Sequence, residues 1–157
     1  MKHKAWAAAV LTALCACGGM SAEFVHTGKK SAPLDVIYVT HSARHGETPD
    51  EGTGELAESL VFALAKRGFK AASFNDRGER AEGYRHHAVL SVFQNLPEDI
   101  LGRRGSLTVH VRIIDARSGE TVSMIRMQCD GCALRDGGST MRVAERLAAG
   151  IDEASRK

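Results

Sequence analysis

Aromatic side chains are scarce in this chain of 157 residues, at 5% Phe, Trp and Tyr together. A core built with so few of them must be filled by aliphatic side chains. Beyond the apolar segment that ends at Leu14, no second run approaches the roughly 20 residues that a helix needs to cross a bilayer. The sequence therefore predicts no further membrane-spanning segment.

The chain also lacks an excess of charge of either sign, since its formal net charge at pH 7 is only +2. Lys2 and Lys4 lie close to its beginning, and removal of residues 1–16 takes them away with no acidic residue, so that the net charge falls to zero. Binding to nucleic acid depends on a concentration of positive charge against phosphates. We therefore expect no nucleic-acid partner.

Motifs of several catalytic classes are missing. No G-x-S-x-G surrounds a serine, and no G-K-[ST] follows the glycines of Gly52-Thr53-Gly54, a segment that alone is too short for a phosphate loop. The C-D-G-C segment at 129–132 is followed by Ala133 instead of His, which excludes covalent haem on this motif. We predict that the chain is not an enzyme and has no catalytic residues and no cofactor.

A metal site is not predicted either. Cys129 and Cys132 have the spacing of half a zinc site, which needs a second pair of ligands. His86 and His87 are adjacent, so on a strand they point to opposite faces and do not easily share a metal ion. One polar cluster follows the first predicted buried strand, where sites gather in α/β sheets, although its composition fits a solvated loop better. That cluster is His41, Arg44, His45 and Glu47.

The beginning of the chain has the order of a secretory signal. A short basic segment, Met1–Lys4, precedes the apolar run Ala5–Leu14, and small residues follow. Ten residues of helix rise only about 15 Å, half of the hydrocarbon core of a bilayer. We expect residues 1–16 to be a signal peptide, in preference to a buried N-terminal helix.

The end of this segment, L-C-A-C-G-G over residues 14–19, resembles a bacterial lipobox. In that pattern Leu stands three residues before the modified cysteine and a small residue one before, as Leu14 and Ala16 do for Cys17. Cys15 fits less well, because Leu14 would then directly precede the cut. The resemblance implies that Cys17 carries a diacylglycerol and further acyl chains such as palmitate, which together anchor stably.

By the same resemblance, Gly18 after the cysteine, where an Asp would favour the inner membrane, implies the periplasmic face of the outer membrane. The alternative is ordinary cleavage nearby, for example after Ser21-Ala22, which leaves a soluble periplasmic protein. If Cys15 leaves with the signal peptide and Cys17 takes the lipid, Cys129 and Cys132 remain. In an oxidising periplasm we expect these two to form a local disulfide.

The rest of the chain predicts one domain at 33–157, preceded by a flexible tether at 17–32. Apolar periodicity predicts strands at 34–39, 71–74 and 87–93, a hairpin of 107–114 with 121–128, and helices at 55–67 and from about 140 onward. The predicted fold class is α+β, an α/β sandwich. Its mixed, largely antiparallel sheet has about 4–5 strands, with two helices packed on one face.

The hairpin R-I-I-D-A-R-S-G-E-T-V at 112–122, with turn residues Asp115 and Gly119, and the helix with its exit at 55–69 carry a family resemblance over roughly 34–154. They resemble small periplasmic lipoproteins, among them the activators of penicillin-binding proteins and the curli secretion lipoprotein, whose domain is similar to the N-terminal domain of TolB. The resemblance implies a non-enzymatic accessory or assembly factor that binds an envelope protein partner. Homo-oligomerisation through exposed sheet edges stays open. The alternative function is a periplasmic thiol-disulfide protein using Cys129 and Cys132.

Overall fold

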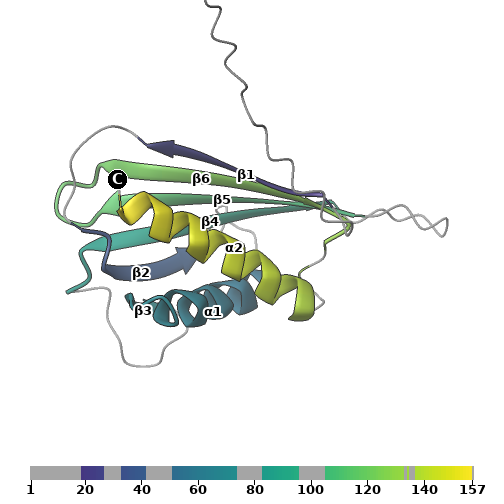
Figure 1. Cartoon of the computed structure of the whole chain (residues 1–157), viewed down its shortest axis with the longest axis horizontal. Helices are drawn as coiled ribbons and strands as arrows, with labels where there is room; N and C mark the ends of the chain where they lie inside the picture. Colours follow the sequence, from purple (N-terminus) through teal and green to yellow (C-terminus); the bar gives the residue numbers. More distant parts are fainter. Residues whose placement is uncertain are drawn as a thin grey trace, which may run out of the picture.

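The computed structural model of the chain describes residues 19–26, 33–41, 51–73, 83–95, 105–132, 134 and 137–156. They form a mixed, largely antiparallel six-stranded sheet with two helices on one face (Figure 1). The predicted α+β fold class is confirmed, with one strand more than expected. Within these residues, no helix combines the length and the apolar character that crossing a membrane requires.

The strands follow the order β1-β6-β5-β4-β2-β3 across the sheet. Strand β2 pairs in parallel with both β3 and β4, whereas the other neighbours are antiparallel. The bounds of the elements are β1 Met20–His26, β2 Val36–His41, α1 Glu51–Ala65, β3 Lys70–Ser73, β4 His86–Asn95, β5 Ser106–Asp115, β6 Thr121–Asp130 and α2 Gly137–Ser155.

Side chains alternate between the two faces of the sheet most clearly in β5 and β6. In β5, Leu107, Val109 and Val111 are buried beneath the helices. His110 and Arg112, which alternate with them along the strand, are exposed on the opposite face. The core is aliphatic, as the scarcity of aromatic residues predicts. Its largest fully buried side chains are Ile37, Leu56, Leu60, Leu64, Leu90, Leu107, Ile113, Ile125, Met127, Leu134, Leu147 and Ile151.

The turn of the β5–β6 hairpin is held by Asp115. Its carboxylate accepts hydrogen bonds from the backbone N–H groups of Ser118 (2.8 Å) and Arg117 (2.9 Å), and these bonds lower the pKa of Asp115 below its ordinary value of 3.8. Gly119 has a φ of 72°, in the left-handed region that favours glycine. Asp115 and Gly119 therefore have the turn role that the sequence predicts for them.

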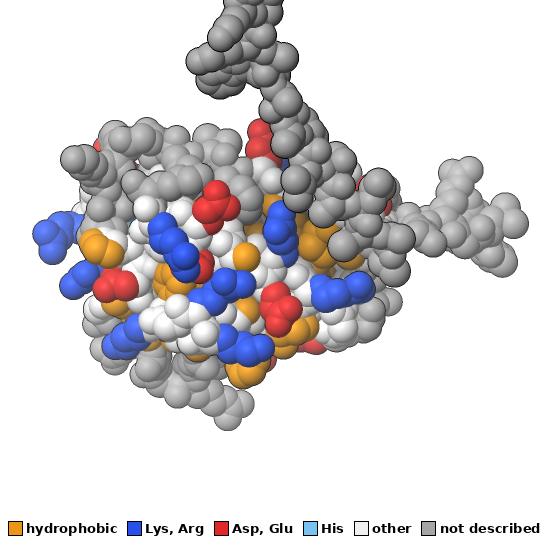
Figure 2. Space-filling model, in the orientation of Figure 1, with side chains coloured by type: hydrophobic (Ala, Val, Ile, Leu, Met, Phe, Trp, Pro, Cys, Tyr) orange, Lys and Arg blue, Asp and Glu red, His pale blue; other side chains and the backbone are white. Residues whose placement is uncertain are grey.

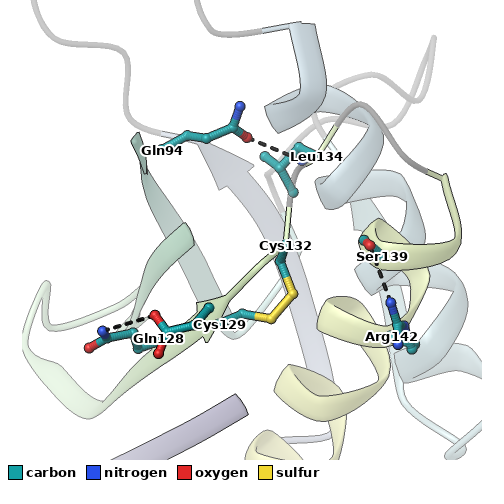
Figure 3. Close-up of a disulfide and its surroundings, with 8 residues drawn as sticks. Gln94, Gln128, Cys129, Cys132, Leu134, Ser139 and Arg142 are labelled. Atoms are coloured by element: carbon teal, nitrogen blue, oxygen red, sulfur yellow. Dashed lines mark hydrogen bonds between the residues drawn. A yellow bond between two sulfur atoms is a disulfide. The ribbon is translucent and has the colours of Figure 1, made fainter. Parts of the chain in front are cut away.

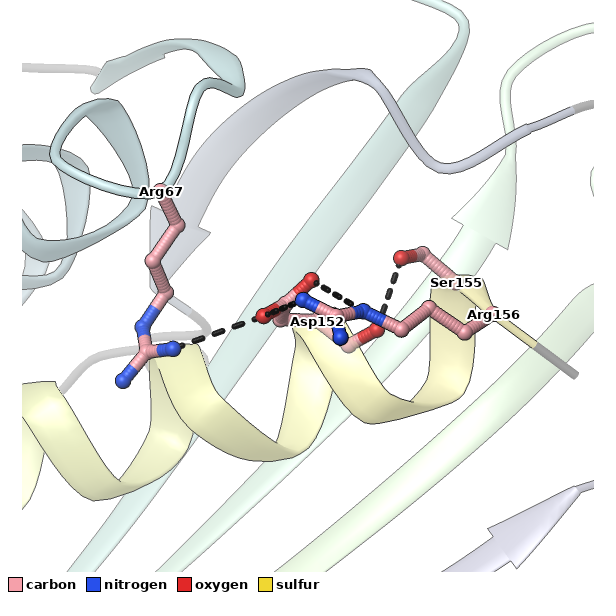
Figure 4. A network of polar contacts seen from close by, with 4 residues as sticks. All are labelled: Arg67, Asp152, Ser155 and Arg156. Carbon is pink, nitrogen blue, oxygen red and sulfur yellow. Dashed lines mark hydrogen bonds and ion pairs between the residues drawn. The ribbon is translucent and has the colours of Figure 1, made fainter.

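The two helices pack against each other and cover the same face of the sheet (Figure 1). A polar network joins the exit of α1 to the end of α2 (Figure 4). The carboxylate of Asp152 forms ion pairs with the guanidinium groups of Arg67 (3.4 Å) and Arg156 (2.8 Å). The backbone carbonyl of Asp152 accepts a hydrogen bond from the hydroxyl of Ser155. The arginines are substantially exposed, so these ion pairs contribute less to stability than the apolar contact beneath them.

Both helices begin earlier than the sequence pattern indicates. Helix α1 starts at Glu51 instead of 55, so Thr53, which could cap a helix that begins at 55, lies within its first turn and is buried. Ser139 and Thr140 lie likewise inside α2. The hydroxyl of Thr140 donates to the carbonyl of Leu134 at 2.9 Å, a tertiary contact that a capping side chain would not make.

The predicted tether at 17–32 is corrected in part, because Met20–His26 within it form strand β1. This strand pairs with β6 along its whole length, from Met20 opposite Cys129 to His26 opposite Ser123. Met20 and Ala22 are partly buried and pack against the core. The free edge of β6 supplies hydrogen-bonding partners that a local reading of this polar segment does not reveal.

We predict that substitutions in β1 depend on the face they occupy. Ala22→Asp puts a carboxylate against the core and should lower the free energy of unfolding by about 1–3 kcal/mol. Ser21→Asp changes an exposed position on the other face and should stay within about 0.5 kcal/mol of wild type. Urea unfolding of both variants measures the difference. Equal effects at the two positions would mean that this segment is a tether.

Candidate functional site

The sequence-based candidates near the beginning of the chain fall mostly outside the described residues. Cys17, the predicted lipidation site, lies there, as do Arg44, His45 and Glu47 of the polar cluster. His41 is described and lies half-buried at the end of β2. The lipid anchor and the outer-membrane location therefore stay predictions.

Cys129 and Cys132 are joined by a disulfide where β6 ends (Figure 3). Their Cα atoms are 5.6 Å apart, and both residues are buried, with 1% and 5% of their surface exposed. Helix α2 begins only at Gly137, so the two sulfur atoms do not lie at its first turn. The arrangement therefore lacks both the access and the helix dipole that activate redox-active thiols.

The chain after the disulfide is held by contacts from three other elements. The backbone N–H of Leu134 donates to the side-chain oxygen of Gln94 in β4 at 3.1 Å (Figure 3). Its carbonyl accepts the Thr140 hydroxyl of α2. The Leu134 side chain is buried so close to Gly52 of α1 that a Cβ atom on Gly52 would overlap its Cβ. The disulfide thus belongs to a packed junction of β6, β4, α1 and α2.

The Gly52-Thr53-Gly54 segment is part of the same packed junction. These residues lie inside α1, where Gly52 and Thr53 are buried. Gly52 is required for the close approach of Leu134, so its role is packing. Nothing about the segment resembles a loop that cradles a phosphate group.

His86 and His87 begin β4 and lie on opposite faces of the sheet. His87 lies beside the ring of Tyr38 on the face that the helices leave open, with 5.9 Å between ring centroids. His86 is completely buried on the helix-covered side, and neither ring nitrogen has a hydrogen-bond partner among the described residues. Burial lowers the pKa of His86 below its ordinary value of 6.5, and the carboxylates of Asp115 and Asp35 oppose that shift.

The face of the sheet opposite the two described helices has a shallow groove of about 420 Å³. We call it the open-face groove. Two arginines, Arg112 of β5 and Arg126 of β6, lie on it beside His110 and the half-exposed Met124. Its lining comprises Glu23, Val89, Ser91, His110, Val111, Arg112, Met124, Ile125 and Arg126.

The alternation of residues 107–114 predicts that Thr108, His110 and Arg112 share the polar face of a strand, but it does not identify a binding surface there. The signal that could have found it is the alternation of β6, which puts Met124 and Arg126 on the same face. The register then brings Arg126 opposite both His110 and Glu23. In the described ranges, no three His, Cys, Asp or Glu side chains gather as they would around a metal ion.

Comparison with known proteins identifies solved structures with a similar fold. No family model matches the chain, and no curated protein matches it. Two solved structures that do match are the PelC dodecamer from Paraburkholderia phytofirmans and a variant of it with a leucine-to-methionine substitution. Each is 16% identical, with a TM-score of 0.60 over 85% of this chain and 97% of the PelC chain. At this identity the similarity establishes a shared fold.

We predict that His86 makes stability fall in mildly acidic solution. Because its pKa is lowered in the folded state, the unfolded state binds protons more readily, so stability is fully present above about pH 6.5 and declines as the pH falls towards the folded pKa. The decline amounts to about 1.4 kcal/mol per unit of pKa difference. The groups that bear on His86 are Asp115, Asp35, Arg85 and His87.

The measurement is urea unfolding from pH 8 to pH 5. His86→Leu should flatten the dependence of the free energy of unfolding on pH. Asp115 contributes only in a more acidic window, because its pKa lies below 3.8. Parallel curves for wild type and His86→Leu would contradict the prediction.

We predict that the Cys129–Cys132 disulfide resists reduction in the folded protein. Both residues are buried, so dithiothreitol followed by alkylation should label them only when urea is present. The double variant Cys129→Ala/Cys132→Ala should fold with a loss of about 2 kcal/mol, since the bridge closes a very short loop. Rapid labelling of the native protein would support the thiol-disulfide alternative.

Proposed function

We propose that the chain is a non-enzymatic, lipid-anchored envelope protein that works as a self-associating subunit of an accessory or assembly complex. The chain supplies Cys17 for the anchor and a compact helix-covered sheet for assembly. We also propose that the protein lies on the periplasmic face of the outer membrane and that it binds a further envelope protein.

The observation that carries the proposal is the match to PelC. Nearly the whole PelC chain, 97%, is covered at a TM-score of 0.60, and PelC is a dodecamer. A match that spans most of both chains means that the two proteins have the same elements available for contacts between subunits. The chain also has a sheet face that neither of the described helices covers, a kind of surface on which subunits can dock. These features favour self-association.

The thiol-disulfide alternative receives no comparable support. Its two cysteines are buried in a junction that involves Leu134 and Gln94 rather than exposed at a helix N-terminus. A bridge in such a place fits a structural part: it ties the end of β6 to the chain that leads into α2.

Native mass spectrometry of the full-length protein, extracted from its host in detergent, tests the proposal. We expect a subunit mass that corresponds to a chain starting at Cys17 with its acyl chains, and an assembly of several subunits. Cys17→Ser should lose the lipid mass and the membrane attachment. A monomer at concentrations of tens of micromolar would refute self-association, and an unmodified Cys17 would refute the anchor.

A further inference from the structure

We propose that the copies of this chain associate head to tail, with the exposed stripe of α1 of one copy seated in the open-face groove of the next. The α1 stripe consists of Glu55, Glu58 and Phe62. This inference rests on the self-association proposed above and names the two surfaces that carry it. It commits to one occupant of the groove, a second copy of the same chain.

The groove carries an excess of positive charge. Arg112 and Arg126 are exposed, and among the described residues no carboxylate forms an ion pair with either guanidinium. Glu23, opposite Arg126 in the register, is the one acidic residue in the lining. The groove therefore offers two arginines against a single carboxylate.

Apolar surface lies next to these arginines. Met124, directly opposite Arg112 in the register, is 44% exposed. Phe93 of β4, on the other side of β5, is 47% exposed, and its ring lies 5.4 Å from the ring of His110. Exposed apolar side chains set among charged ones are typical of a surface that another protein covers.

The α1 stripe has the opposite charge and its own exposed aromatic ring. Glu55 and Glu58 are exposed, and neither is in an ion pair in the described structure. Phe62 is 55% exposed, the most of any large hydrophobic side chain described. Lys66 lies 5.3 Å from the centre of its ring but is also paired with Glu145 of α2, at 3.7 Å.

The distance between the two glutamates of the α1 stripe is close to the distance between the two arginines of the groove. Residues three apart on a helix, as Glu55 and Glu58 are, have their Cβ atoms roughly 5–6 Å apart. Arg112 and Arg126 lie on paired antiparallel strands, offset by two residues, which puts them roughly 7–8 Å apart. The long arginine side chains easily span the difference of about 2 Å. Both carboxylates can therefore pair with the two guanidinium groups while Phe62 packs on the exposed apolar side chains of Met124 and Phe93.

The two surfaces cannot meet within one molecule. Helix α1 packs on one face of the sheet (Figure 1), whereas the residues that line the groove belong to the other face. On the face drawn in Figure 2, basic, acidic and apolar side chains are interspersed. A contact between different surfaces of identical chains is heterologous and repeats from copy to copy, which gives a closed ring when the rotation closes.

Charge reversal on each surface tests the pairing with the full-length protein in detergent, by native mass spectrometry and light scattering. Glu55→Arg/Glu58→Arg alone gives a chain with two positive surfaces, and Arg112→Glu/Arg126→Glu alone a chain with two negative ones. Each should dissociate, with at least about a hundredfold weaker self-association, because like charges then face each other. The control Arg117→Glu/Arg146→Glu changes two exposed arginines outside both surfaces and should assemble as wild type does.

Mixing restores the complementarity. Equal amounts of the two double variants should assemble with alternating subunits, and one chain with all four reversals should assemble by itself. Circular dichroism of each variant confirms that it folds. The rescue on mixing cannot come from a repaired fold, since neither double variant alters the other chain.

The outcomes separate this inference from the proposal on which it rests. A monomeric wild type refutes both. An oligomeric wild type that withstands both double reversals leaves self-association intact and refutes this interface. If groove reversal dissociates the assembly while stripe reversal does not, the groove takes another acidic surface, and the pairing with α1 is refuted. Absence of rescue on mixing refutes it as well.

Discussion

The structure depends on the fact that both helices cover the same face of the sheet. A strand whose side chains alternate must bury one set and expose the other, and β5 and β6 do so along most of their length. The buried set, such as Val109 and Ile125, meets the helices. The exposed set has no layer of secondary structure in front of it in the described part of the chain. The charge and apolar surface of the open face follow from this two-layer arrangement.

The same arrangement explains why the end of β6 needs reinforcement. There the chain leaves the sheet and must cross to the helix layer, where α2 begins and α1 also has its first turn. Backbone groups in such a crossing lose their ladder partners and have to find others. Gln94 and Thr140 provide them for Leu134, while the disulfide limits how the chain can turn. Gly52 lets the crossing pack directly on α1.

Local pattern was sufficient to predict the hairpin, both helices and the buried strands, because each of these has its periodicity within a short window. It failed for β1, where Ser21 and Glu23 are polar and the pairing with β6 spans about a hundred residues. It also failed at Gly52, which by itself is typical of a helix boundary but here is selected by contact with Leu134. In both cases the deciding neighbour is distant in sequence.

The open-face groove shows the same limit. The sequence predicts the strand that contains Arg112, and its alternation predicts that Arg112 lies on the exposed face. That Arg126 and Glu23 join it depends on the registers of β5 with β6 and of β6 with β1, which no single strand encodes. The α1 stripe, in contrast, lies within one helix, and the spacing of Glu55, Glu58 and Phe62 already puts them on one side. What the sequence could not indicate is that Phe62, a large apolar residue, is left exposed on this side.

Taken together, the two proposals restrict the symmetry of the assembly. Subunits anchored through Cys17 must all present that end to one leaflet. Dihedral symmetry would turn half of the copies over and carry their anchors away from the membrane. Cyclic symmetry with its axis along the membrane normal keeps every anchor on the same side, and a cyclic ring with more than two members requires a heterologous contact between neighbours. A single surface paired with itself would end at a dimer. Two different complementary surfaces on opposite sides of one sheet, as the α1 stripe and the open-face groove are, meet that requirement.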